Sequence, residues 1–290
     1  MNSPCPICSA ETTLIGTQVG KLDRRQFYMR HCSLCHFSFI QNYRSDFEIL
    51  YNKDYYHGKG ADPLVDYVYE LNNIKTTIRN YEWSGIFKVF RQLCPNGGRW
   101  LDFGCGGGGM VRYALSRGVD AMGVEDGWLA DQGRSQGLPI LSTDELNRFA
   151  GSYDFVTAIE VIEHIPQPIE VLKTIRQLLK PGGVFFLTTG NARPFRQSLL
   201  DWGYTQCPDV HVSFFEPKTL ERSLTMAGFE SQFAPLSDGL IDVIKYKVLK
   251  NFQIKNRHGL IDALPWQLIA RVVDAKYEVS KMPYGVAVGN

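Results

Sequence analysis

The chain lacks an apolar run of about 18 residues, the length that a membrane-spanning helix requires. Residues 1–5 also lack the basic region and apolar core of a secretory signal peptide. Lys and Arg total 31 against 30 Asp and Glu, so no excess of either charge indicates a nucleic-acid partner. Together these absences predict a cytoplasmic protein with no membrane partner.

The composition is that of an ordinary globular protein, 44% hydrophobic and 21% charged. A length of 290 residues suits one large domain, or one domain with a small appendage. Hydrophobic periodicity predicts helices at 46–52 and 65–89. The aromatic residues between them, at 51–57, are expected on a loop that either caps a ligand pocket or covers the edge of a core.

Four of the seven cysteines form two C-x-x-C pairs, which are Cys5 with Cys8 and Cys32 with Cys35. Each pair can form a tight knuckle that points two thiolates at one ion, and two knuckles complete the tetrahedral site of structural zinc. Segments 12–20 and 26–29 are predicted to form a hairpin between the pairs. The pattern therefore predicts a zinc ribbon. The first alternative is that the cysteines bind no metal, and the second is that they hold an iron–sulfur cluster.

The stretch 100–109 predicts a strand, a glycine-rich turn and the start of a helix. Such a junction lets a nucleotide-like ligand contact main-chain N–H groups. The glycines alone do not identify that ligand, because Gly104, Gly106 and Gly109 also satisfy the G-x-G-x-x-G of NAD-binding proteins.

Strands and helices alternate after this turn, which predicts a doubly wound α/β sheet with helices on both faces. Strands are predicted at 100–103, 120–124, 139–141, 155–159 and 184–188, and helices at 108–117, 128–136 and 169–179. Asp102, Glu125 and Glu160 fall at the carboxyl ends of strands, where such sheets bind ligands. Glu125, or Asp126 in its place, lies at the spacing that suits ribose hydroxyls.

Asp102-x-Gly104-x-Gly106 resembles the first motif of class I S-adenosylmethionine-dependent methyltransferases. Segment 153–165 resembles the fourth strand of that family, 179–187 its "LKPGG" approach to strand five, and 211–229 its entry to strand six. The resemblance covers about residues 98–235. The cysteine pairs followed by a Tyr-rich segment resemble a bacterial subgroup with an N-terminal zinc ribbon, which is linked to natural-product or surface-sugar biosynthesis.

The resemblance implies a seven-stranded, mostly parallel sheet. Segments 229–236 and 284–288 become the sixth and seventh strands, with the seventh antiparallel at the sheet edge. An insertion at about 237–280 then contains a helix at 261–277. The implied S-adenosylmethionine site consists of Asp102, Gly104, Cys105, Gly106, Glu125, Asp126, Ile159 and Glu160. Predicted domains are a zinc ribbon at 1–40, a helical and aromatic lid and connector at 41–97, and the methyltransferase domain at 98–290.

Methyl transfer to oxygen or an acidic carbon needs a base, and histidine titrates near neutral pH. His164 and His211 are the candidates, with two satisfied structural histidines as the alternative. Glu160-x-x-Glu163-His164 also resembles the E-x-x-E-H of ubiquinone-pathway O-methyltransferases and of small-RNA 2′-O-methyltransferases. In the latter a distant histidine completes a magnesium site, a part that His211 could take here. The same E-x-x-E-H pattern occurs in methyltransferases that bind no metal. A magnesium site is therefore the second hypothesis for these residues, after a role of the histidines as base.

These features predict an enzyme that transfers a methyl group to O, N or C of a small metabolite or sugar. An RNA methyltransferase whose zinc ribbon recognises the substrate is the alternative. An NAD-dependent oxidoreductase and a non-enzymatic binding module are disfavoured by Asp102 and the later motifs. The sequence leaves the acceptor and the oligomeric state open.

Overall fold

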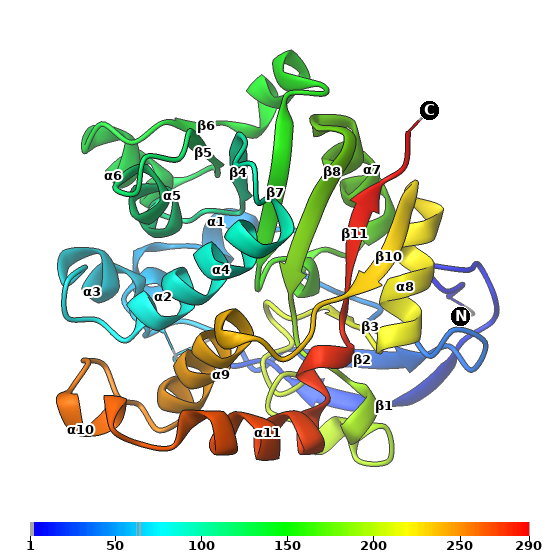
Figure 1. Ribbon diagram of the computed structural model, residues 1–290. Helices are drawn as coiled ribbons and strands as arrows, with labels where there is room; N and C mark the ends of the chain where they lie inside the picture. The colour runs from blue at the N-terminus through cyan, green and yellow to red at the C-terminus, as the bar shows by residue number, and fades with distance from the viewer. Residues whose placement is uncertain (1–2, 62, 64, 290) are drawn as a thin grey trace.

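The chain from Trp100 to Ala287 builds a seven-stranded sheet in the computed structural model, which describes residues 3–61, 63 and 65–289 (Figure 1). Its strands are β4 (Trp100–Phe103), β5 (Ala121–Val124), β6 (Ile140–Leu141), β7 (Tyr153–Ile159), β8 (Leu179–Thr188), β10 (Phe229–Phe233) and β11 (Pro283–Ala287). The strand order is β10-β11-β8-β7-β4-β5-β6, and the strands from β8 to β6 are paired in parallel. The predicted fold class is confirmed.

Strand β11 runs antiparallel, as predicted, but its predicted place at the sheet edge is wrong. It pairs with β10 on one side and with β8 on the other, so β10 is the edge strand. The reason lies in its burial: Pro283, Tyr284 and Gly285 are all buried, which suits an interior strand and not an edge.

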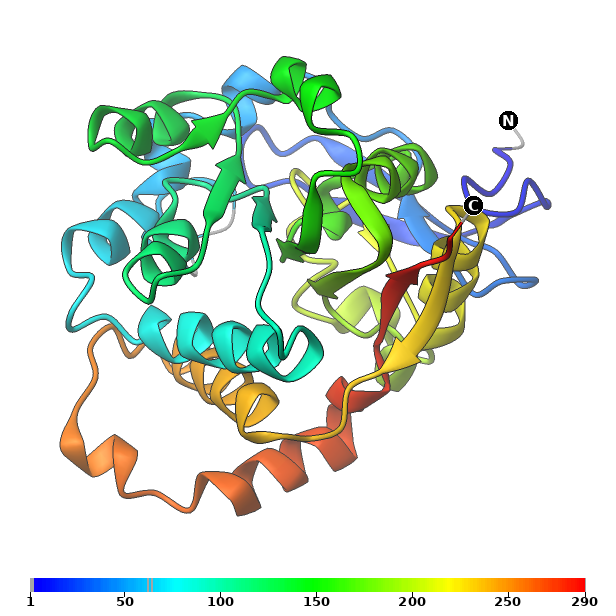
Figure 2. The same cartoon turned by 45° about the horizontal axis from the view of Figure 1, so that its top comes forward.

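Helices cover both faces of the sheet, because alternate residues of each strand point to opposite sides. Trp100 packs with α4 (Arg79–Leu93), α5 (Gly109–Leu115) and α9 (Asp238–Asn251). Leu101 belongs to the core on the other face, with α7 (Pro168–Leu178) and α8 (Pro217–Met226). Figure 2 shows α4 and α9 side by side over the first face. Helix α6 (Trp128–Ser135) precedes β6.

Two predicted helices are interrupted. The predicted helix at 65–89 is α3 (Tyr67–Asn72) and α4, because the main chain between them bonds to the insertion: Ile78 N–H donates to Lys255 O at 3.0 Å. The predicted helix at 261–277 is α10 (Gly259–Asp262) and α11 (Trp266–Tyr277), separated at Pro265, which has no N–H to donate. Helix α9, within the same insertion, was not predicted.

The remaining short helices lie in connections. The predicted helix at 46–52 is α1 (Phe47–Leu50), and α2 (Lys53–Tyr56) takes up part of the expected aromatic loop. The 3₁₀ turns are η1 (Thr143–Phe149), η2 (Ile162–His164), η3 (Arg193–Phe195), η4 (Leu199–Asp201) and η5 (Val279–Lys281).

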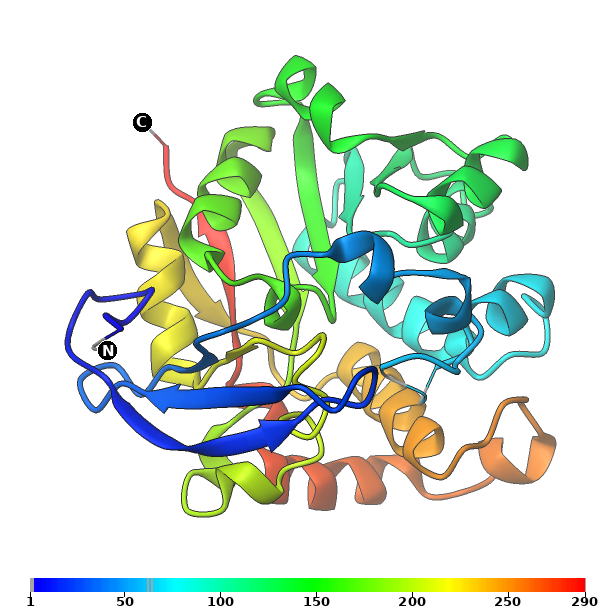
Figure 3. The ribbon, with the colours of Figure 1, turned by 180° about the vertical axis from the view of Figure 1, so that it is seen from behind.

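The N-terminal segment forms the predicted hairpin, β1 (Thr13–Val19) with β2 (Gln26–His31). Strand β3 (Ser38–Ile40) extends this sheet and pairs with β9 (Ser213–Phe214) of the larger domain (Figure 3). The hydroxyl of Thr219 on α8 also donates to Cys35 O at 2.6 Å. The predicted 1–40 segment is therefore joined to the larger domain by a strand pair, while residues 1–2 and 290 lie outside the described part of the chain.

Candidate active site

The predicted cofactor residues gather at one edge of the sheet, because parallel pairing holds neighbouring strand ends at the same level. Asp102 on β4 lies opposite Gly123 of β5 and Thr157 of β7. Glu125 follows β5 directly, and Glu160 follows β7. The three acids therefore stand at the carboxyl end of the sheet, where ligands bind in this fold class.

The glycine turn after β4 is tightly constrained. Gly104 has φ +75°, and a Cβ there would lie 2.6 Å from Val161 Cγ2, so neither the conformation nor the space admits a side chain. Gly106 N–H donates to Glu125 Oε2 at 3.2 Å. The carboxylate of Asp126 instead accepts from the Thr143 hydroxyl at 2.5 Å. Glu125, and not Asp126, therefore lies against the glycine turn.

Asp102 is buried, and its Oδ1 accepts a hydrogen bond from the Thr157 hydroxyl at 2.8 Å. Burial raises the pKa of Asp102 to about 7, although the Thr157 hydrogen bond lowers it. The charge of Glu82 raises the pKa further and that of Arg79 lowers it. A cationic ligand group placed here would hold Asp102 in its ionised form.

Arg79, at the start of α4, is the charged neighbour that sequence analysis missed. It pairs with Glu70 at 2.8 Å and Glu82 at 2.5 Å and stacks against Tyr246, with 4.6 Å from its guanidinium carbon to the ring centroid. No motif marks this arginine: its acidic partners Glu70 and Glu82 lie nearby in the sequence, but Tyr246 comes from the distant helix α9. Its position beside Asp102 depends on the packing of α4 against the sheet.

The side chains of Cys105 and Ile159 pack toward the interior of the sheet. A Cβ at Gly123 would lie 2.4 Å from Cys105 Sγ, so the thiol points back toward β5. Burial raises the pKa of this thiol well above its usual value. Ile159 packs against the apolar core under α4, α5 and α9. Only the main chain at 105 faces the turn.

Three of the four predicted catalytic side chains converge. Donor atoms of Glu163, His164 and His211 all lie within 4.8 Å of one another. Nδ1 of His164 lies 3.0 Å from Val210 O, and Nδ1 of His211 lies 3.0 Å from Tyr204 O. A carbonyl oxygen only accepts, so each Nδ1 carries the proton in these bonds. The basic lone pair of each neutral ring is therefore on Nε2.

Glu160, the fourth predicted residue, turns away from the histidines. It adopts φ +55°, a conformation that non-glycine residues rarely hold and that is often found at functional sites. Its carboxylate accepts from Lys247 Nζ at 2.7 Å, from the Thr188 hydroxyl at 3.0 Å and from the Tyr204 hydroxyl. Burial alone would raise the pKa of Glu160, but the nearby lysines outweigh it and lower the pKa.

Glu163 is almost fully buried, and within the described residues its Oε2 has no hydrogen-bond partner. Burial, followed by the charge of Glu160, raises the pKa of Glu163 to about 8. The hypothesised magnesium set of Glu160, Glu163, His164 and His211 is therefore not assembled as one group. Two imidazole nitrogens and one carboxylate suit a softer divalent ion better than Mg²⁺, which prefers oxygen ligands.

His211 is held by a stack of aromatic rings. Phe195 stacks on Trp202 with centroids 4.9 Å apart, Trp202 on Tyr204 at 4.8 Å, and Tyr204 on His211 at 4.6 Å. Such ring pairs fix orientation as well as burying apolar surface. The only signal for this stack in the sequence is the density of aromatic residues between 195 and 211.

Comparison with known proteins identifies the family and the fold. The model of the methyltransferase domain family matches residues 76–232, more than half of the chain. This chain belongs to that family. The strand order and the acid before the glycine turn agree with this assignment to the methyltransferase domain family. A cofactor-binding module without activity and an NAD-dependent oxidoreductase are not favoured.

Two relatives are ubiquinone biosynthesis O-methyltransferases. That of Dechloromonas aromatica is 40% identical over 153 residues, which are 47% of this chain and 66% of that protein. That of Aeromonas salmonicida is 31% identical over 212 residues, 61% of this chain and 87% of that protein. The chain spans about half the length of other curated relatives, such as 46% of the Acinetobacter baumannii protein.

A solved structure shows the same fold. Phosphoethanolamine N-methyltransferase 2 of Haemonchus contortus has a TM-score of 0.51 and 17% identity, covering 87% of this chain and 63% of that one. In the part of this methyltransferase that the structure describes, no helix has the length and apolarity needed to cross a membrane.

The segment before α4 covers the glycine turn of the methyltransferase. A Cβ at Gly107 would lie 2.2 Å from Leu71 Cδ1, so α3 rests directly on the turn. Tyr55 and Tyr56 are buried in a cluster that includes Leu129 of α6. The Tyr51 hydroxyl lies 3.2 Å from His164 Nδ1. These aromatic residues therefore lie over the strand ends, and not on a free loop.

The four paired cysteines converge as predicted. Sγ–Sγ distances are 3.5 Å for Cys5–Cys35, Cys8–Cys32 and Cys8–Cys35, and none of the four forms a disulfide. Zinc with four thiolates at about 2.3 Å needs sulfurs about 3.8 Å apart, so the donor set fits that ion. The two knuckles share one geometry, because Ser9 and His36, each four residues after the first cysteine of a pair, both have positive φ.

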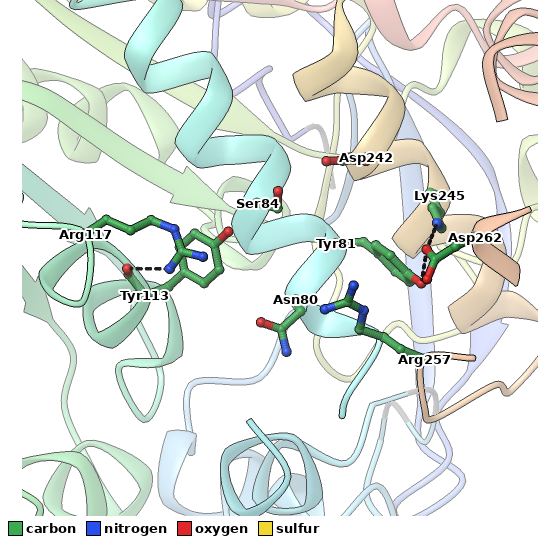
Figure 4. Close-up of a pocket in the computed structure, with 9 residues that line it drawn as sticks. All are labelled: Asn80, Tyr81, Ser84, Tyr113, Arg117, Asp242, Lys245, Arg257 and Asp262. Atoms are coloured by element: carbon green, nitrogen blue, oxygen red, sulfur yellow. Dashed lines mark hydrogen bonds and ion pairs between the residues drawn. The ribbon is translucent and has the colours of Figure 1, made fainter. Parts of the chain in front are cut away.

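A cavity of about 380 Å³ opens elsewhere, between α4, α5 and α9 (Figure 4). Its walls are polar and include Asn80, Arg117 and Lys245. Lys245 is paired with Asp262 at 2.6 Å and is buried, so its charge is compensated inside the protein. None of the predicted cofactor or catalytic residues lines this cavity.

Proposed function

We propose that this methyltransferase transfers the methyl group of S-adenosylmethionine to an oxygen of a small metabolite or sugar. The observation that carries the proposal is the convergence of Glu163, His164 and His211 within 4.8 Å beside the cofactor edge of the sheet. A hydroxyl acceptor must lose a proton as its oxygen is methylated, and a neutral imidazole suits that role.

The cofactor supplies a methyl group already activated on a sulfonium, so most of the catalysis assigned to the chain is positioning. Asp102, a buried acid at the end of β4, is assigned to the cofactor's ammonium group. Arg79, whose positive charge lowers the pKa of Asp102, is assigned to its carboxylate. Glu125 is assigned to the ribose hydroxyls. It already holds the glycine turn at Gly106, whereas Asp126 is engaged with Thr143.

The proton of the acceptor hydroxyl is assigned to Nε2 of His211 or His164. His211 has the firmer support, because its ring is stacked on Tyr204 and its Nδ1 is fixed on a carbonyl oxygen. Glu163 lies next to the histidines, where it can receive a hydrogen bond or stabilise an imidazolium. Lys247 pairs with Glu160 and compensates its charge, and Glu163, with its raised pKa, adds a negative charge only when it ionises.

Oxygen is favoured over nitrogen or carbon because a base is present and because the named relatives are O-methyltransferases. A small acceptor is favoured over RNA, since the lid segment packs on the glycine turn and the charge of the chain is balanced. Within this proposal the cysteine cluster holds a structural zinc ion, as in the zinc-ribbon subgroup that the sequence resembles.

Separate alanine variants of His164 and His211 test the base. Turnover is measured as S-adenosylhomocysteine formed with a panel of phenols, catechols and sugars. We expect at least one variant to lose about a hundredfold or more in kcat, the usual contribution of a general base. S-adenosylhomocysteine binding, followed by calorimetry, should stay unchanged. His258→Ala, at the exposed residue that precedes α10, is the control.

Wild-type turnover in both variants would contradict the catalytic assignment. Loss of activity in EDTA that returns with a divalent ion but not with zinc would favour the metal hypothesis at Glu163, His164 and His211. Tight binding of NAD without S-adenosyl binding would overturn the function itself.

A further inference from the structure

Helix α11 is apolar on two opposite sides. Its inner side, with Trp266 and Ile269, packs against Tyr246 and Leu249 of α9. Leu268 and Val272, one turn apart on the other side, are 60% and 63% exposed. Apolar residues on both sides are typical of a helix that is covered on both sides. Within the described chain only the inner side of α11 is covered.

Further exposed apolar residues precede the helix at intervals of four. Leu264 is 47% exposed and Leu260, on α10, is 74% exposed. Phe252, which ends α9, is also 74% exposed. We call these five residues the outer stripe: Phe252, Leu260, Leu264, Leu268 and Val272. Helices α10 and α11 lie together along one outer margin of the molecule in Figures 1 and 2.

The segment that carries the outer stripe is strongly basic. Residues 245–281 contain eight Lys and Arg against three Asp and Glu, although the whole chain is nearly neutral. Two of the three acids are neutralised, Asp262 by Lys245 and Glu278 by Arg193 and Lys281. Among the described residues, Arg271 and Lys276 are exposed on α11 and form no ion pair. Lys250 and Arg257 instead lie over the rings of Tyr246 and Tyr81.

We propose that the outer stripe and these basic residues form a docking surface for an anionic lipid membrane. A helix with exposed leucines and flanking Lys or Arg lies in the plane of the interface, where apolar burial and charge attraction add. A second copy of the chain fits less well, because pairing the stripe with itself would bring like charges together. The proposal does not depend on the identity of the methyl acceptor, and it replaces the expectation from the sequence that the protein has no membrane partner.

Vesicle flotation with the full chain tests the proposal. The wild type should float with phosphatidylcholine vesicles that contain phosphatidylglycerol, float less with phosphatidylcholine alone, and be released by salt. The double variant Leu268→Glu, Val272→Glu should bind at least about tenfold more weakly. Met226→Glu, at an exposed apolar position on α8, is the matched control and should float like the wild type.

The melting temperature and S-adenosylhomocysteine affinity of each variant show whether it is folded. A wild-type chain that binds neither kind of vesicle would overturn the proposal, as would a double variant that floats as well as the wild type. A dimer seen by light scattering that the double variant dissociates, without vesicle binding, would assign the stripe to a second copy instead.

Discussion

At the residue scale, single acids and histidines carry the proposed chemistry, and their environment decides what they can do. Asp102 and Glu125 end adjacent strands, yet only Glu125 holds the glycine turn, while Asp102 is buried against Thr157. Asp102 could be selected from its place before the glycines. Arg79 could not, because nothing in the local sequence shows that α4 brings it near Asp102.

Asp102→Asn should stabilise the ligand-free protein and weaken cofactor binding. Because burial raises the pKa of Asp102 to about 7, the folded chain retains a proton there that the unfolded chain has lost above about pH 4. The free energy of unfolding therefore falls as pH rises from about 4 to 7, by at most about 4 kcal/mol. Asparagine does not titrate, so the variant should not show this fall in the free energy of unfolding.

Thermal melts on both sides of this pH window check the sign. The melting temperature of Asp102→Asn should exceed that of the wild type above about pH 7 and approach it below about pH 4. Calorimetry should show S-adenosylmethionine binding at least about tenfold weaker. A lower melting temperature above neutral pH, or unchanged affinity, would contradict the assignment of Asp102.

At the element scale, hydrogen bonds to other segments of the chain and single residues such as proline decide where a helix begins and ends. The apolar periodicity from 65 to 89 predicts one helix, but the main chain at 76–78 bonds to the insertion and interrupts it. Pro265 divides the predicted helix at 261–277, and this break could have been predicted because a proline is visible in the sequence. The cysteine knuckles were predictable, because C-x-x-C spacing constrains geometry locally.

Cys32→Ser should remove the proposed zinc ion and destabilise the fold. Structural zinc contributes free energy to folding directly, so we expect a loss of about 3 kcal/mol or more, or about 6 °C in melting temperature. Metal analysis should find one zinc per wild-type chain and none in the variant. Cys94→Ser, at a partly buried cysteine outside the cluster, is the control. A wild type without zinc would end the zinc-ribbon proposal.

At the scale of the whole molecule, the N-terminal ribbon and the methyltransferase domain share structure. Strand β3 pairs with β9, and the core that contains Cys5 and Cys35 also contains Phe215 and Leu220. Because these contacts cross the predicted boundary at residue 40, the ribbon has no separate core of its own.

We therefore expect the protein to unfold in one cooperative transition, with equal calorimetric and van't Hoff enthalpies. Removal of zinc should move the whole transition to lower temperature and should not create a separate early one. A chain that begins at residue 41 should be insoluble or partly folded. Two resolved transitions, or a stable 41–290 fragment, would show that the ribbon is an independent domain.

The sequence by itself determined the sheet class, the cysteine cluster, the placement of the acids at one edge of the sheet and the histidine pair. Each of these depends on local spacing or on strand ends that parallel pairing brings together. Only the tertiary structure decided that β11 lies inside the sheet, that Lys247 neutralises Glu160, and that Glu163 joins the histidines without Glu160. These features join segments tens of residues apart. Burial and charge pairing act between neighbours in space, whereas a sequence pattern records only neighbours along the chain.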